Sequence, residues 1–221
     1  NPYISCFTIE AAGGQDEGTT DDLPYAQRVA KHLSVPLHVV RIDAGRMAGD
    51  LARMIEQLDE PLADPAPLNV LYISELARQN GMKVLLSGAG GDDLFTGYRR
   101  HRAIAMERLW SWMPRPARHA LDRGAGSLDQ RRAWSRRLAK LFAGAALDRD
   151  QRVANYFAWA READLAALYT PDFRRHMGDA PAVQPMLDFL APLPAGTPPL
   201  ERMLALEQRF FLSDHNLPYT D

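Results

Sequence analysis

The sequence has 221 residues, of which 46% are hydrophobic and 24% are charged, and its formal net charge is −2. This composition excludes a largely disordered chain, and a globular chain of this length buries roughly 70% of its unfolded surface. No apolar run approaches the ~20 residues of a membrane span, and no signal segment opens the chain, so we expect no membrane partner. The single cysteine, Cys6, excludes an internal disulfide and favours a cytoplasmic location.

The first part of the chain alternates strand-like and helix-like segments. Tyr3 to Ile9 is a short β-rich run, and the glycine-rich segment Ala11 to Thr20 predicts a crossover loop. A helix is predicted behind Asp22, which we expect to be its N-cap, because apolar residues follow at helical spacing. These residues are Leu23, Ala26, Val29, Ala30 and Leu33.

The same alternation continues to the middle of the chain. Leu37 to Ile42 predicts a strand, Arg46 to Leu58 and Leu68 to Gln79 predict helices, and the apolar run Val84 to Leu86 predicts a strand covered on both faces. Such alternation is typical of a doubly wound α/β fold with a parallel sheet, in which ligands bind beyond the carboxyl ends of the strands. Ile9 and Ser87 are both expected at such ends.

The second part of the chain has a different composition. Arg99 to Lys140 contains 12 basic and 3 acidic residues, with three tryptophans among the arginines: Trp110, Trp112 and Trp134. This pattern suits stacking on nucleic acid or on an anionic substrate. We favour the alternative that the tryptophans pack beneath solvated arginines, so a nucleic-acid partner is not expected. Further on, residues 151–170 and 200–213 are helical in pattern, separated by a proline-rich connector from Pro181 to Pro199.

A glycine-rich segment follows the run Val84 to Leu86. Gly88, Gly90 and Gly91 allow close backbone approach to an anion, and Asp92 adds a carboxylate. An acid beside phosphate oxygens requires a divalent cation between them, and magnesium takes carboxylates together with substrate phosphates. The segment therefore predicts a site for ATP and Mg²⁺, and it matches neither a Walker A loop nor a dinucleotide fingerprint. The alternative is a tight turn in which Asp92 or Asp93 caps the next helix.

Other candidate chemistry is sparse. Six scattered histidines show no paired metal-ligand spacing, so a zinc site is not expected, and Ser87 lacks the surroundings of a hydrolase nucleophile. Asp59, Glu60 and Asp64 form an acidic cluster, for which we favour a loop that caps the next helix over a role in shaping an acceptor pocket.

Four elements in order resemble the synthetase domain of glutamine-dependent asparagine synthetases and their relatives, which include β-lactam synthetase and lasso-peptide cyclases. Phe7-Thr8-Ile9 is similar to the family's second strand, and Asp22 with the segment from Ala26 to Leu33 resembles its next helix. The other two elements are Asp59-Glu60-Pro61 with Ala63-Asp64-Pro65, and Ser87-Gly88-x-Gly90-x-Asp92-Asp93-Leu94-Phe95-x-Gly97-Tyr98. From Arg102 to Ala195 the resemblance is weak.

The resemblance implies a fold of the adenine nucleotide alpha-hydrolase type, with an α/β nucleotide-binding part over 1–98 and a mainly helical part over 99–221. It implies an ATP-dependent ligase that activates a small-molecule or peptide carboxylate as an acyl-adenylate, with a glutaminase domain or another nitrogen donor, and it allows a homodimer. In this reading Asp92 binds Mg²⁺, Ile9 meets the adenine edge, and Ser87, Gly88, Gly90 and Gly91 line the nucleotide.

Departures from the family pattern leave alternatives open. The Ser-Gly-Gly-x-Asp-Ser pyrophosphate loop does not occur in the sequence, and the basic residue that follows the family's equivalent of Asp221 lies beyond its end. We therefore expect a fragment whose catalytic residues lie outside it and which is inactive alone. Ala89 stands where asparagine synthetases carry glutamate, which puts aspartate amidation in doubt and keeps open a binding or scaffold module without catalysis.

Overall fold

The computed structural model describes residues 4–12, 22–60, 62, 64–129, 131–160, 162–178, 181–218 and 220. The chain divides into two compact units. The first comprises Asn1–Ala89 with His215–Asp221, and the second comprises Gly90–Asp214. The division falls inside the glycine-rich segment, between Ala89 and Gly90.

The first unit contains a parallel pair of strands, β1 (Cys6–Ala12) and β2 (Leu37–Asp43). Both strands were predicted, but β1 ends three residues later than expected, and Ile9 lies opposite Val40 within the ladder. The expectation that Ile9 ends a strand is therefore wrong, because the backbone pairing continues to Ala12, opposite Asp43. The predicted loop from Ala11 to Thr20 is wrong for Ala11 and Ala12, which belong to β1, and its residues 13–20 lie outside the described residues.

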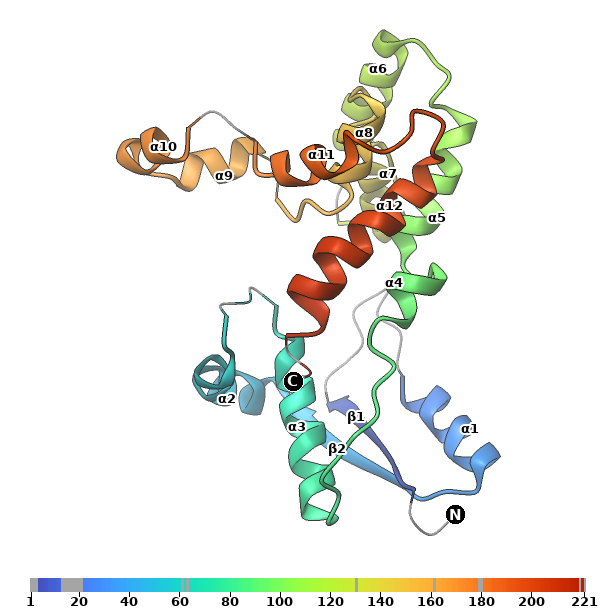
Figure 1. Ribbon diagram of the computed structural model, residues 1–221, viewed down its shortest axis with the longest axis vertical. Coiled ribbons are helices and arrows are strands. Elements are labelled where there is room, and N and C mark those ends of the chain that lie inside the picture. Colours follow the sequence, from blue (N-terminus) through green and yellow to red (C-terminus); the bar gives the residue numbers. More distant parts are fainter. Residues whose placement is uncertain are drawn as a thin grey trace. The chain divides into compact units, whose positions relative to one another are not determined.

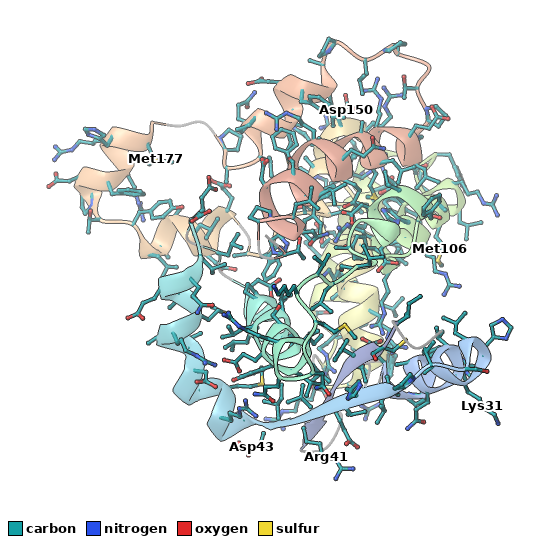
Figure 2. All side chains as sticks on the ribbon, turned by 60° about the horizontal axis from the view of Figure 1, so that its bottom comes forward. Lys31, Arg41, Asp43, Met106, Asp150 and Met177 are labelled. Carbon is teal, nitrogen blue, oxygen red and sulfur yellow. The ribbon has the colours of Figure 1, made fainter. Side chains whose placement is uncertain are left out.

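Three helices pack against these strands: α1 (Leu23–Leu33), α2 (Ala44–Gln57) and α3 (Ala66–Gln79), with α1 and α3 on different sides of the pair (Figure 1). Asp43 at the end of β2 caps α2, because its carboxylate accepts a hydrogen bond from the Arg46 amide at 2.8 Å (Figure 2). Asp22 occupies the predicted cap position of α1 but makes no side-chain capping bond. The core of this unit consists of Ile42, Met54, Leu68 and Tyr72.

The predicted strand Val84 to Leu86 does not form. Residues 82–88 have no regular structure, and Val84 and Leu86 are 78% and 98% exposed. A strand needs a neighbour that accepts and donates its backbone hydrogen bonds. Within the described part of the chain the sheet contains β1 and β2 alone, and it does not pair with this segment. The expectation of a strand covered on both faces is therefore wrong, because the segment has no pairing partner among the described residues.

The second unit is helical (Figure 1). Its core contains Ile104, Val153, Phe157, Leu190, Met203 and Leu206. The described helices are α4 (Gly91–Phe95), α5 (Arg99–Met106), a 3₁₀ turn η1 (Glu107–Leu109), α6 (Arg115–Gly126), α7 (Ala133–Phe142), α8 (Arg149–Asn155), α9 (Glu162–Leu168), α10 (Pro171–Met177), α11 (Gln184–Leu190), α12 (Pro199–Leu206) and a π-helix η2 (Glu207–Asn216).

Two expectations about this unit need correction. The proline-rich connector contains a helix, α11, because Pro185 stands in the first turn, where a missing N–H costs nothing. Of the three tryptophans, Trp110 is buried and packs on Phe142, as the packing interpretation predicts. Trp112 and Trp134 are 76% and 50% exposed, so for these two the packing interpretation is wrong.

Candidate functional site

Three of the residues predicted to line the nucleotide lie in the α/β unit: Ile9, Ser87 and Gly88. Ile9 is a partly buried strand residue that packs against the unit's core. Ser87 follows the irregular segment, and its Oγ accepts a hydrogen bond from the Ala89 amide at 3.0 Å, which closes a local turn. The hydroxyl oxygen is thereby used as an acceptor for a backbone amide.

The other predicted residues, from Gly90 to Asp92, lie in the helical unit. Gly90 has φ +86°, a left-handed conformation that favours glycine, and it is the N-cap of α4. No side chain caps this helix. The alternative that Asp92 or Asp93 serves as the N-cap is therefore wrong, and each carboxylate has another environment.

Asp92 and Asp93 have opposite surroundings although they are adjacent. Asp93 is fully buried and accepts a hydrogen bond from the Tyr98 hydroxyl at 3.3 Å. Asp92 is exposed, and its carboxylate lies against Gly97, where a Cβ atom would overlap it. Asp92 is thus the carboxylate of this segment that a solvent-borne ligand can reach.

The exposed Asp92 fits a magnesium site of one kind only. Among the described residues no group of three or more His, Cys, Asp or Glu side chains could hold a metal ion. A metal at Asp92 would therefore take most of its ligands from phosphate oxygens, water and any further carboxylate, which is how magnesium is commonly bound with nucleotides. The chemistry of this donor fits the expected group.

The acidic cluster that precedes α3 also contains both a carboxylate that is bonded within the protein and carboxylates that are exposed. Asp64 accepts a hydrogen bond from the Ala66 amide at 2.9 Å and pairs with His215 Nε2 at 3.1 Å, which confirms a capping role for this residue. Asp59 and Glu60 are exposed. Asp64 is committed to structure, and the other two carboxylates remain accessible to a ligand.

Sequence reasoning missed a buried polar network behind Asp93. Arg100 binds Glu207 through two hydrogen bonds of 2.5 and 2.6 Å, and His101 Nε2 donates to the same carboxylate at 2.8 Å. Glu207 is 0% exposed. The signal that could have revealed it is a lone acid among apolar residues at helical spacing, Met203, Leu206 and Phe210.

A parallel strand pair with packed helices, together with a glycine-rich turn that presents an exposed carboxylate, defines an α/β protein with a candidate nucleotide site. The profile of the asparagine synthase family matches residues 1–221. The chain therefore belongs to that family, whose fold is of the adenine nucleotide alpha-hydrolase superfamily.

Curated relatives carry related names. The chain is 31% identical over 124 residues to a protein of Mycobacterium tuberculosis (strain ATCC 25618 / H37Rv) provisionally named asparagine synthetase (glutamine-hydrolyzing); the match covers 56% of this chain and 18% of the relative. A Methanocaldococcus jannaschii protein with the corresponding provisional name is 38% identical over 109 residues, 48% of this chain and 19% of its own. "Amidase chyE" of Penicillium rubens is 31% identical over 110 residues, 49% and 16% respectively.

The matched part of the chain thus spans less than a fifth of each of these relatives. No solved structure matches the chain. Within the residues that the structure describes, no helix is long and apolar enough to cross a membrane.

Proposed function

We propose that the protein is an ATP-dependent amide-forming ligase, which activates a carboxylate as an acyl-adenylate for attack by ammonia or an amine. The observation that carries the proposal is Asp92: an exposed carboxylate that caps no helix, in a glycine-rich turn of a chain that belongs to the asparagine synthase family. The names of the curated relatives support amide chemistry.

Asp92 would hold Mg²⁺, and the bound ion would neutralise charge on the pyrophosphate leaving group. Gly90 and Gly91 would allow the backbone to approach the phosphates, and Ser87 and Gly88 would line the ribose and α-phosphate side. The main chain near Ile9 would meet the adenine edge. Catalytic residues are proposed to lie outside these 221 residues, so the isolated chain would show little or no turnover.

Ala89 bears on the substrate. Its methyl group supplies no acid, base or hydrogen bond beside the reacting centre, so we propose a small-molecule or peptide carboxylate other than aspartate as the acceptor. The same residue favours a second candidate function, a family member that binds ligands without catalysis. The two functions differ in one reaction: only the ligase exchanges pyrophosphate into ATP in the presence of its carboxylate.

The proposal extends to partners and location. A glutaminase domain or free ammonia would supply nitrogen, the protein would act in the cytoplasm, and it could form a homodimer. The basic surface of Arg99 to Lys140 is not proposed to bind nucleic acid, since the family supplies a small-molecule function.

The test is Asp92→Ala in the full-length protein. Because Asp92 is exposed and caps nothing, its loss should abolish Mg²⁺-dependent ATP binding in calorimetry and leave the melting temperature nearly unchanged. Asp172→Ala is the matched control, since Asp172 is also an exposed aspartate in a first helical turn. Unchanged nucleotide binding by Asp92→Ala would refute the assigned role, and a large loss of stability would make Asp92 a structural residue.

A further inference from the structure

The π-helix Glu207–Asn216 presents three side chains to the segment that carries Asp92. Glu207 binds Arg100 and His101, the Phe211 ring lies 5.7 Å from the Tyr98 ring, and Leu212 packs beside Gly90. These positions are four and five residues apart, which places them on one face of a helix with π spacing. Both ends of the segment 90–101 therefore rest on the same helical face.

The contact at the far end of the segment is rigid. The Arg100 guanidinium lies 4.0 Å from the centre of the Tyr98 ring and 4.2 Å from that of Phe211, while Glu207 holds it from the edge with two hydrogen bonds. A planar cation held both by its faces and by its edge has little rotational freedom.

Tyr98 connects Arg100 and Phe211 to the short helix that carries Asp92. Its ring is fixed by Arg100 and Phe211, and its hydroxyl donates to the buried carboxylate of Asp93. Asp93 is the residue next to Asp92 in α4. The orientation of the short helix is thus tied to the π-helix through Tyr98, in addition to the packing of Leu212 beside Gly90.

Gly97 fixes the side chain of Asp92 directly. Its amide donates to the Asp92 carbonyl at 3.0 Å, and the Asp92 carboxylate occupies the space where a side chain at position 97 would begin. Thr96, with φ +62°, turns the chain so that Gly97 meets Asp92. Any residue with a Cβ at position 97 must displace the carboxylate.

We propose that Gly97 and Tyr98 are positioning residues for the carboxylate of Asp92, and that the face of the π-helix formed by Glu207 and Phe211 supports them. The inference rests on the proposed function, because Asp92 is the residue being positioned. It assigns a structural role to four residues for which the sequence predicted none: Gly97, Tyr98, Glu207 and Phe211.

The free-energy cost of burying the Arg100–Glu207 ion pair supports a positioning role. Burying an ion pair such as Arg100–Glu207 is weak evidence for a gain in stability, because removal from water offsets much of the attraction. Buried and fully bonded pairs do restrict a structure to one geometry. A site in which one exposed carboxylate must meet a metal gains from that restriction, since groups behind a metal ligand commonly control its orientation.

The experiment compares Gly97→Ala with the wild-type full-length protein in equilibrium binding of a non-hydrolysable ATP analogue over a range of Mg²⁺ concentrations. We expect the concentration of Mg²⁺ required for half-maximal binding to rise by about 10- to 100-fold, with metal-free nucleotide binding unchanged. Gly124→Ala is the control, because a Cβ at position 124 meets nothing within 4 Å. Tyr98→Phe, which removes only the hydroxyl, should shift the requirement in the same direction by a smaller factor.

A double variant identifies the route of the effect. In the Asp92→Ala background, where Mg²⁺-dependent binding is expected to be lost, adding Gly97→Ala should leave the remaining metal-free nucleotide binding unchanged, because the carboxylate that it displaces is gone. A wild-type-like Mg²⁺ requirement in Gly97→Ala, or a further loss of nucleotide binding when Gly97→Ala is added to Asp92→Ala, overturns the inference while the proposed function stands. Absence of Mg²⁺-dependent binding by the wild-type protein overturns the proposed function and the inference with it.

Discussion

Arg202 illustrates how single residues organise the helical unit. Its side chain is almost fully buried, yet its guanidinium donates to Asp150 Oδ2 at 3.1 Å and to the backbone carbonyls of Leu190, Leu193, Pro194 and Thr197. Asp150 lies on α8 (Figure 2). One side chain therefore joins α8 to the turn that follows α11 and satisfies carbonyl groups that would otherwise be buried without partners.

Arg202→Met should destabilise the protein by about 3–5 kcal/mol, because it removes the charge that several buried acceptors require. Urea denaturation monitored by circular dichroism measures the change. Arg149→Met is the matched control: Arg149 also binds Asp150 and a carbonyl, that of Ala195, but its side chain is 39% exposed, so its loss should cost less than about 1 kcal/mol. Equal losses in the two variants would contradict the importance assigned to burial.

Tyr156 should make stability depend on alkaline pH. Burial, together with the nearby Glu107 carboxylate, raises the pKa of its phenol well above the ordinary value of 10.0. The folded state therefore keeps the proton where the unfolded chain releases it, so this contribution to stability is complete below pH 10 and declines as the pH rises above that value. Tyr156→Phe cannot lose a proton.

The free energy of unfolding of wild type and Tyr156→Phe should be compared at pH 8 and near pH 11. At pH 8 the wild type should be the more stable protein, because Tyr156 donates a hydrogen bond to Glu107 at 3.1 Å. Its advantage should shrink at the higher pH. An advantage that stays constant would mean that the phenol keeps an ordinary pKa in the fold.

The candidate site was only partly visible in the sequence. Gly90 and Asp92 could be singled out because a glycine-rich turn with an acid has a local signature. Glu207 and Arg100 could not be paired, because nothing local relates residues so far apart in sequence, and a charged side chain within a helical pattern is ordinarily expected on the surface. The residues that hold the turn in place became apparent only in the folded structure.

At the scale of elements, an aspartate that precedes a helix does not always form a capping hydrogen bond with it. Asp22 and Asp43 both precede helices in the α/β unit, but only Asp43 accepts a hydrogen bond from the first turn. Asp43→Ala should therefore cost about 1 kcal/mol, whereas Asp22→Ala should cost only a few tenths. Thermal denaturation of the two variants measures the difference. A larger loss from Asp22→Ala would show that the cap of α1 forms in solution.

Helices were predicted more successfully than strands, for a physical reason. The apolar spacing that predicted α1, α2 and α3 reflects a ladder of hydrogen bonds within each helix, so the sequence of the segment contains most of the information. A strand depends on a neighbour, and Val84 to Leu86 has the composition of one without the pairing. The sequence could not predict that η2 is a π-helix, because the spacing of its apolar residues also fits an ordinary α-helix.

At the scale of the whole molecule, the irregular segment 82–88 should govern solution behaviour. It exposes Val84 and Leu86 almost completely, and apolar extended segments without a partner strand tend to pair between chains. We therefore expect the 221-residue chain to self-associate, and Leu86→Lys to reduce this association without loss of stability, because the leucine is 98% exposed.

Sedimentation velocity over a range of concentrations measures the association. Leu168→Lys is the control, since Leu168 is 79% exposed but lies in a helix, whose backbone groups are already paired. Equal effects of the two substitutions would indicate general hydrophobic association in place of pairing by the extended segment. No effect of Leu86→Lys would exclude the segment as the cause.

The α/β unit is discontinuous in sequence, since residues 1–89 are completed by residues 215–221, and His215 returns to pair with Asp64. Because a ribosome synthesises the chain from its N-terminus, all of residues 90–214 emerge before residues 215–221 do. The helical unit can therefore finish folding while the α/β unit still lacks His215. During translation, the contact between His215 and Asp64 can form only after residues 90–214 have been synthesised.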